Sequence, residues 1–213
     1  MSRPARTLGT GVVLIVAFVL GLFAARHWSV GSAPDPALTH ATLYPSPQAL
    51  GELELTDQDG RPFTTDALRG HWWLVFFGFT QCPDVCPTTL ATLARTRAQL
   101  ADLPAELQPR VLLISVDPER DTPERLAAYV RYFDPQFSGA TGSLQAVAAT
   151  AKRFGVPYAK VASAGGGYTL DHGAGVFFVD PQAAIEAYSS APHDATVLAT
   201  DYRALVSFRK SRT

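Results

Sequence analysis

Continuous apolar runs alternate with amphipathic segments along most of the chain. Residues 72–77 and 111–116 are apolar throughout and have the length of buried strands. Helical spacing of apolar positions, together with residues that start or stop helices, predicts four helices, at residues 87–103, 122–132, 143–154 and 194–210. Strands that alternate with helices predict an α/β layer fold, in which helices flank a central sheet.

Two further patterns predict hairpins. Glu52–Leu55 alternates apolar and polar residues like a strand, and Asp59-Gly60 after it is typical of a tight turn. Near the end of the chain, Asp180-Pro181 separates two apolar runs at residues 175–179 and 184–188. We therefore expect an antiparallel hairpin to extend the central sheet, which makes the sheet mixed.

The N-terminal segment has the pattern of a membrane anchor. Residues 8–25 carry no charge, and a helix of this length would reach about 27 Å, close to the thickness of a bilayer core. Arg3 and Arg6 favour a cytoplasmic N-terminus. A cleaved signal peptide is the alternative, although the apolar run is long for one. Either interpretation places the remaining chain outside the cytoplasm.

Composition divides the chain into three parts: residues 1–28 as the anchor, residues 29–48 as a proline-rich tether, and residues 49–213 as one globular domain. The chain has 213 residues, of which 47% are hydrophobic, enough for a core of ordinary size. Its 18 basic and 19 acidic residues give a net charge of −1 without a basic stripe, so nucleic acid is not an expected partner.

The two cysteines of the chain, Cys82 and Cys86, are separated by three residues and follow the apolar run 72–77. Pro87 lacks an N–H and suits the first position of a helix, which would make Cys86 the N-cap. The positive end of the helix dipole favours thiolate, the form that attacks disulfides and binds metals. The pair could therefore be a soft metal clamp, a redox couple or a structural disulfide.

A third candidate ligand is His172, which lies among glycines just before the apolar run 175–179. Asp171 beside it could orient the imidazole ring. An ordinary loop histidine is the alternative interpretation of this position. Two thiolates and an imidazole would suit copper, because thiolates select Cu(I) and a nitrogen ligand helps to hold Cu(II). Zinc is the competing metal, but a structural zinc site normally has four protein ligands.

Three segments resemble the SCO/SenC proteins: residues 78–87 (GFTQCPDVCP), residues 115–123 (SVDPERDTP) and residues 170–172 (LDH). The resemblance covers about residues 50–205, with Gly173 in place of a common serine. It implies a thioredoxin-like copper chaperone, anchored in a membrane, that serves assembly of the binuclear copper centre of cytochrome c oxidase.

For individual residues, the resemblance implies that Cys82, Cys86 and His172 bind Cu(I) or Cu(II). It makes Asp84 and Asp117 candidates for tuning the site or docking a partner; turn chemistry is the alternative for Asp117. The expected partners are the copper-containing oxidase subunit and an upstream periplasmic copper donor. The expected location is a bacterial inner membrane, since no arginine- and serine-rich leader precedes the apolar segment.

Copper delivery is the leading functional hypothesis. The main alternative is a thiol–disulfide oxidoreductase that keeps the cysteines of the oxidase copper site reduced, by cycling Cys82 and Cys86 between dithiol and disulfide. A copper-responsive sensor and a peroxide-scavenging enzyme on the same fold are further alternatives.

Overall fold

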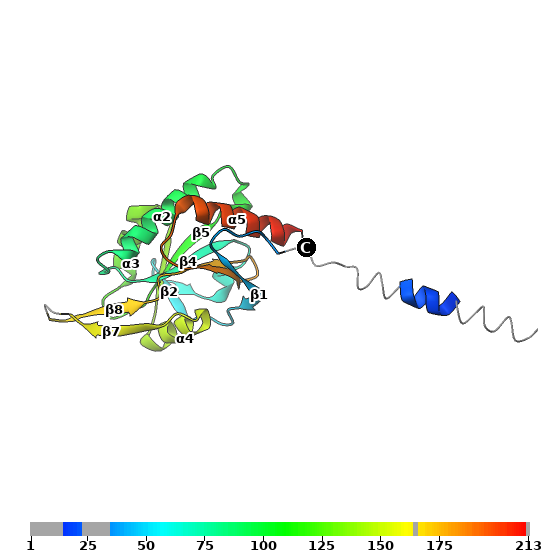
Figure 1. Ribbon diagram of the computed structural model, residues 1–213. Helices are drawn as coiled ribbons and strands as arrows, with labels where there is room; N and C mark the ends of the chain where they lie inside the picture. Colours follow the sequence, from blue (N-terminus) through cyan, green and yellow to red (C-terminus); the bar gives the residue numbers. More distant parts are fainter. Residues whose placement is uncertain (1–14, 23–34, 164–165, 212–213) are drawn as a thin grey trace, which may run out of the picture. The chain divides into compact units, whose positions relative to one another are not determined.

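The computed structural model describes residues 15–22, 35–163 and 166–211 (Figure 1). Residues 15–22 are helical, and residues 36–210 form one structural unit. Most of the predicted anchor, residues 8–25, lies outside the described residues. Within the part of the chain that is described, no helix combines the length and the apolar character that a membrane crossing requires.

The described residues between 36 and 210 include ten strands, which form two sheets. The strands are β1 (Thr42–Ala49), β2 (Leu55–Asp57), β3 (Pro62–Phe63), β4 (Trp73–Gly78), β5 (Arg110–Ser115), β6 (Ser138–Thr141), β7 (Tyr158–Ala162), β8 (Tyr168–His172), β9 (Val176–Val179) and β10 (Ala184–Ser189). Eight of them form one sheet in the order β1-β10-β9-β4-β5-β6-β2-β3, and β7 pairs with β8 alone. β4, β5 and β6 are parallel to one another, whereas the other pairs are antiparallel, so the main sheet is mixed as predicted.

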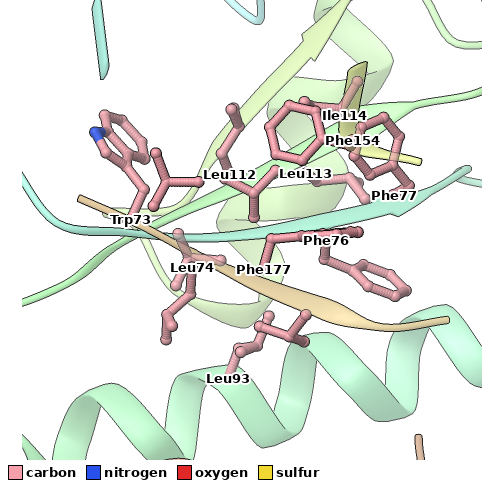
Figure 2. Close-up of a cluster of buried hydrophobic side chains, with 14 of the residues drawn as sticks. Trp73, Leu74, Phe76, Phe77, Leu93, Leu112, Leu113, Ile114, Phe154 and Phe177 are labelled. Carbon is pink, nitrogen blue, oxygen red and sulfur yellow. The ribbon is translucent and has the colours of Figure 1, made fainter. Parts of the chain in front are cut away.

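Four helices cover the two faces of the main sheet: α2 (Val85–Gln99), α3 (Pro123–Phe133), α4 (Leu144–Phe154) and α5 (Ala195–Lys210). Successive side chains of β4 point to opposite faces, because strand side chains alternate. Leu74 points toward Leu93 of α2, whereas Phe77 packs against Phe154 of α4 with ring centroids 5.0 Å apart (Figure 2). All six residues of β4 are buried, which confirms the strand predicted at residues 72–77.

The helices predicted at residues 122–132, 143–154 and 194–210 are confirmed as α3, α4 and α5. Side chains of the preceding residues cap them, as the sequence indicates. Ser143 Oγ accepts a hydrogen bond from the backbone of α4, and Asp194 Oδ1 accepts two from the first turn of α5. These caps satisfy N–H groups that have no partner within a helix.

Helix α2 begins two residues earlier than predicted, at Val85, and its N-cap is Asp84. Cys86 is therefore not the N-cap but lies within the first turn. Pro87 occupies the third helical position, which it tolerates because the first N–H groups of a helix have no intrahelical acceptors. Proline thus marked the first turn of the helix without fixing its first residue.

Strand β1 occupies a segment that we assigned to the tether. It forms one edge of the main sheet and pairs with β10 in two short stretches, with a register shift between Leu43 and Gln48. Pro45 and Pro47 lie in that interval, and proline is tolerated on an edge strand because one side of the strand needs no hydrogen bonds. The structural unit accordingly begins before residue 49.

A buried carboxylate attaches the chain just before β1 to α5. Asp201 is fully buried, and its two oxygens accept hydrogen bonds from the backbone N–H groups of Thr39, His40 and Ala41, at 2.5, 2.9 and 2.7 Å. Charge-assisted hydrogen bonds are stronger than neutral ones. Asp201 therefore fixes the point at which the N-terminal segment enters the domain.

Replacing Asp201 by alanine should destabilise the domain by about 2–3 kcal/mol or more, because three backbone donors lose their acceptor in a buried place. Urea unfolding followed by circular dichroism would measure this change. The matched control is Asp102→Ala, which removes only an exposed ion pair with Arg203. Equal stability of the Asp201 and Asp102 variants would contradict the role assigned to Asp201.

Candidate metal centre

The cysteines lie at the edge of the sheet where β4 ends and α2 begins. Cys82 is in the connecting loop, and its N–H donates to Phe79 O at 3.2 Å. Cys86 is in the first turn of α2 and is completely buried. A Cβ atom on Gly78 would lie 2.9 Å from Cys86 Sγ, so glycine is required for this close approach. Cys82 and Cys86 are not joined by a disulfide.

His172 ends β8 and reaches the cysteines because of the strand that follows it. β9 pairs with β4 in a register that sets Val176 opposite Phe76, close to the end of β4. His172, four residues earlier, thereby lies beside the cysteine loop, with Nε2 at 3.4 Å from Cys86 Sγ. The rings of Phe76 and Phe79 meet the imidazole edge-on, with centroids 6.0 and 5.8 Å away.

The orientation of the imidazole leaves one nitrogen available as a ligand. His172 Nδ1 lies 3.1 Å from Gly173 O. A carbonyl oxygen only accepts hydrogen bonds, so Nδ1 carries the proton and Nε2 presents its lone pair toward the cysteines. A metal-bound histidine typically donates its second N–H in this way. The carbonyl of Gly173 thus holds the ring, the role we considered for Asp171.

The three candidate ligands are brought together. The sulfur atoms of Cys82 and Cys86 and a ring nitrogen of His172 all lie within 4.8 Å of one another. With zinc bond lengths of about 2.0–2.3 Å as a guide, two ligands of one ion lie at most about 4.6 Å apart, so the cluster needs little movement to hold an ion. Copper is the metal that two sulfurs and one imidazole fit, whereas a structural zinc site would need a fourth ligand.

A hydrogen bond between the cysteines gives them opposite acidities. A hydrogen bond from the side chain of Cys86 stabilises the Cys82 thiolate and, against the opposing effect of burial, lowers the pKa of Cys82 to about 4. The same interaction and burial raise the pKa of Cys86. The Cys86 N–H also points at Cys82 Sγ over 3.4 Å, at the positive end of α2. Cys82 is therefore a thiolate at neutral pH, while Cys86 keeps its proton.

The cluster opens to solvent on the side of Cys82. A cavity of about 370 Å³ lies there, and Cys82, Asp84, Asp171 and His172 contribute to its walls. Cys82 is 9% exposed and Cys86 is not exposed at all. Asp84 and Asp171 are exposed at the same cavity. The two carboxylates therefore give its entrance a negative character.

Asp117 lies at the same edge of the sheet as the cysteine loop. It follows β5, and Val116 N–H donates to Gly78 O at 2.9 Å. Its side chain is buried and bonds to Arg120 and to the hydroxyl of Tyr168, at 2.5 and 2.8 Å. Asp117 thus connects the segment after β5 to the hairpin that carries His172.

One residue that supports the cysteine loop escaped the sequence analysis. Asp121 precedes α3 but does not cap it, because the N-cap is Thr122. The carboxylate of Asp121 is buried and instead accepts hydrogen bonds from the backbone and hydroxyl of Thr80, at 3.0 and 2.6 Å, and from Ser115 at 2.6 Å. The sequence signal that could have indicated this role is the position of Asp121, which is the second aspartate, after Asp117, to follow the buried strand β5.

Fold and site together define a thioredoxin-like α/β domain with a Cys-Cys-His cluster where its parallel strands end. The chain belongs to the SCO1/SenC family, whose sequence pattern matches residues 42–207. A protein of Stutzerimonas stutzeri that is named for copper binding is 39% identical over 152 residues, which cover 70% of this chain and 73% of that protein.

Two solved structures show the same fold. The copper-bound crystal structure of Arabidopsis thaliana ScoI is similar with a TM-score of 0.69 and 30% identity, over 76% of this chain and 98% of the other. The solution structure of apo Sco1 from Thermus thermophilus has a TM-score of 0.69 and 35% identity, over 81% and 99% of the two chains. The thioredoxin-like fold and the family are thus as the sequence predicts.

Alkylation of the reduced, metal-free protein by iodoacetamide should test the acidity of Cys82. Only the thiolate form reacts. For an ordinary thiol with a pKa of about 8.5, the thiolate fraction, and with it the reaction rate, rises about tenfold for each unit by which the pH increases below the pKa. Cys82, with a pKa of about 4, is already a thiolate at pH 6, so its rate should be nearly constant between pH 6 and 8. Fragment mass spectrometry would distinguish its adduct from that of Cys86.

The matched variant is Cys86→Ala, which removes the thiol that donates a hydrogen bond to Cys82 and keeps the backbone N–H. The pKa of Cys82 should rise toward its ordinary value, so its alkylation rate should become steeply dependent on pH. A tenfold increase in the alkylation rate of Cys82 between pH 6 and pH 7, measured on the protein without substitutions, would rule out the stabilised thiolate.

Proposed function

We propose that the protein is a copper metallochaperone that binds one copper ion through Cys82, Cys86 and His172. The observation that carries the proposal is the mutual distance of their ligand atoms, all within 4.8 Å. The donor chemistry supports copper in both oxidation states, because the thiolates suit Cu(I) and the imidazole adds a ligand for Cu(II). Copper in the related ScoI structure supports the same assignment.

A delivery protein must also release its metal, and the arrangement of the ligands suits this need. Cys82 and His172 line an open cavity, whereas Cys86 is buried beneath them. A ligand of the receiving protein can approach through the cavity and replace the accessible donors first. The carboxylates of Asp84 and Asp171 at its entrance would attract a copper ion or a basic rim on the partner.

The proposed destination is the copper centre of cytochrome c oxidase, in the copper-containing subunit of that enzyme. Membership of the SCO1/SenC family supports this assignment. The uncharged segment of residues 8–25 supports a single-pass anchor in a bacterial inner membrane, with the domain on the periplasmic side. Copper would reach the protein there from an upstream periplasmic donor.

The acidity of Cys82 supports a second function, thiol–disulfide exchange. A stabilised thiolate beside a protonated thiol can attack a disulfide of a partner, after which Cys86 resolves the mixed disulfide. The partner disulfide gains two electrons, and Cys82 and Cys86 become a disulfide. Reduction of the cysteines of the oxidase copper site would prepare that site for copper.

Replacing His172 by alanine should separate the two functions. In an anaerobic titration of the reduced full-length protein in detergent, we expect the affinity for Cu(II) to fall by more than about tenfold, because a ligand is lost. Binding of Cu(I) by the dithiol and reduction of a disulfide substrate should continue. The matched control is His40→Ala, which removes an exposed imidazole that bonds to Ser190 O.

Unchanged Cu(II) affinity and an unchanged thiolate-to-copper absorption band in the His172 variant would exclude the three-ligand site.

Transfer of copper to a partner is tested separately, by mixing the copper-loaded protein with the reduced copper-binding domain of an oxidase subunit. Metal should move to that domain at a rate that depends on both proteins. If the dithiol reduces the oxidase domain but copper is never transferred, the metallochaperone proposal is wrong and only the oxidoreductase function remains.

A further inference from the structure

The guanidinium of Arg120 lies between the cysteine loop and the hairpin that carries His172. Its Nε donates to Asp117 Oδ2 at 2.5 Å. Its Nη1 donates to Gln81 Oε1 at 3.1 Å, in the cysteine loop, and to Tyr168 O at 3.0 Å, in β8. One side chain therefore bonds to the sheet edge, to the loop of Cys82 and to the strand of His172.

The aromatic ring of Tyr168 strengthens this connection. The guanidinium carbon of Arg120 lies 3.8 Å from the ring centroid, a cation–π contact. The hydroxyl of Tyr168 donates to Asp117 Oδ1 at 2.8 Å. Asp117 is buried, and each of its two oxygens thus accepts a hydrogen bond from a side chain. We call these three residues, Asp117, Arg120 and Tyr168, the hairpin clamp.

The hairpin needs such a clamp because it stands apart from the main sheet. Strands β7 and β8 pair only with each other among the described strands, and Figure 1 shows them projecting from the body of the domain. Side-chain contacts therefore set much of its position. Besides the clamp, Lys160 of β7 pairs with Glu119 at 2.6 Å, but both of these side chains are more than 40% exposed. An exposed ion pair contributes little.

We propose that Arg120 is a positioning residue of the copper site, which holds the hairpin so that His172 stays within reach of Cys82 and Cys86. Tyr168 and His172 are the two ends of β8, five residues long. A clamp at one end therefore limits the tilt of the strand and the place of the imidazole at the other. The proposal rests on His172 being a copper ligand, and it adds the contact that sets how tightly this ligand is held.

The chemistry of the clamp requires arginine rather than any cation. A planar guanidinium presents five N–H donors in a fixed fork and stacks on an aromatic ring, so it can bond to several acceptors at once. Lysine in the same place could keep the ion pair with Asp117 while losing the bonds to Gln81 and Tyr168. Arg120→Lys therefore loosens the hairpin without leaving a buried carboxylate unpaired.

Copper binding to the full-length Arg120→Lys protein is the first test. The affinity for Cu(II) should fall about tenfold, the usual effect of removing a contact that orients a metal ligand. The absorption and electron paramagnetic resonance spectra of Cu(II) should change, because the imidazole no longer holds one position. The affinity for Cu(I), held mainly by the thiolates, should change less than threefold.

The matched control is Arg131→Lys, which alters an exposed ion pair with Asp59 away from the copper site. It should leave the copper spectra unchanged. If Arg120→Lys does not fold, Gln81→Ala provides the second variant, because it removes only the bond between Arg120 and the cysteine loop, at an exposed side chain. This variant should lower the affinity for Cu(II) in the same direction.

The decisive measurement is a double-mutant cycle between Arg120→Lys and His172→Ala. If Arg120 acts by positioning His172, its substitution should have no further effect on Cu(II) affinity once the imidazole is gone. Equal losses from Arg120→Lys with and without His172 would overturn the clamp proposal. Unchanged affinity in His172→Ala alone would instead remove the three-ligand site, so the two failures are distinguishable.

Discussion

Parallel pairing between β4 and β5 places the chemically important segments at one edge of the sheet. Gly78 at the end of β4 lies opposite Ser115 at the end of β5, and the N–H of Val116, just after β5, donates to Gly78 O. Both strands are almost entirely buried, so a slip by one residue would exchange the side chains that pack against the helices on the two faces. This register makes neighbours of the cysteine loop and Asp117–Asp121, and the carboxylates of that segment hold Thr80 and Arg120.

The dithiol and the imidazole are held by different kinds of contact. Cys86 belongs to a helix packed on the main sheet, and the buried carboxylate of Asp121 fixes the loop before it. His172 belongs to a separate two-stranded hairpin, held by side-chain bonds and by edge contacts with Phe76 and Phe79. A proposed copper site built this way has two well-fixed sulfurs and one more adjustable nitrogen, which suits a metal that must be held and then transferred.

Local patterns predicted the parts of this structure that depend on nearby residues. The apolar runs 72–77 and 111–116 form the central strands β4 and β5. The cysteines lie at the start of a helix, as Pro87 indicated, because the preference of proline for the first turn is a local effect. Strand β1 was missed because Pro45 and Pro47 break its pattern, and only pairing with β10, more than 130 residues away, defines it. The contacts of Asp121 and Arg120 were missed because they too join segments far apart in the sequence. No local pattern predicts a hydrogen bond from Arg120 to β8.

Under the proposed function, the different burial of the two cysteines determines the order in which they release copper. Cys86 is enclosed, with its thiol close to Gly78 and the imidazole, whereas Cys82 faces the cavity. An incoming ligand therefore meets Cys82 first, and Cys86 is the last donor to let go. Copper bound by both sulfurs must displace the proton of Cys86, because metals bind the thiolate form. The hydrogen bond with Cys82 and burial both raise the pKa of Cys86. Return of the proton to Cys86 therefore favours release of the metal.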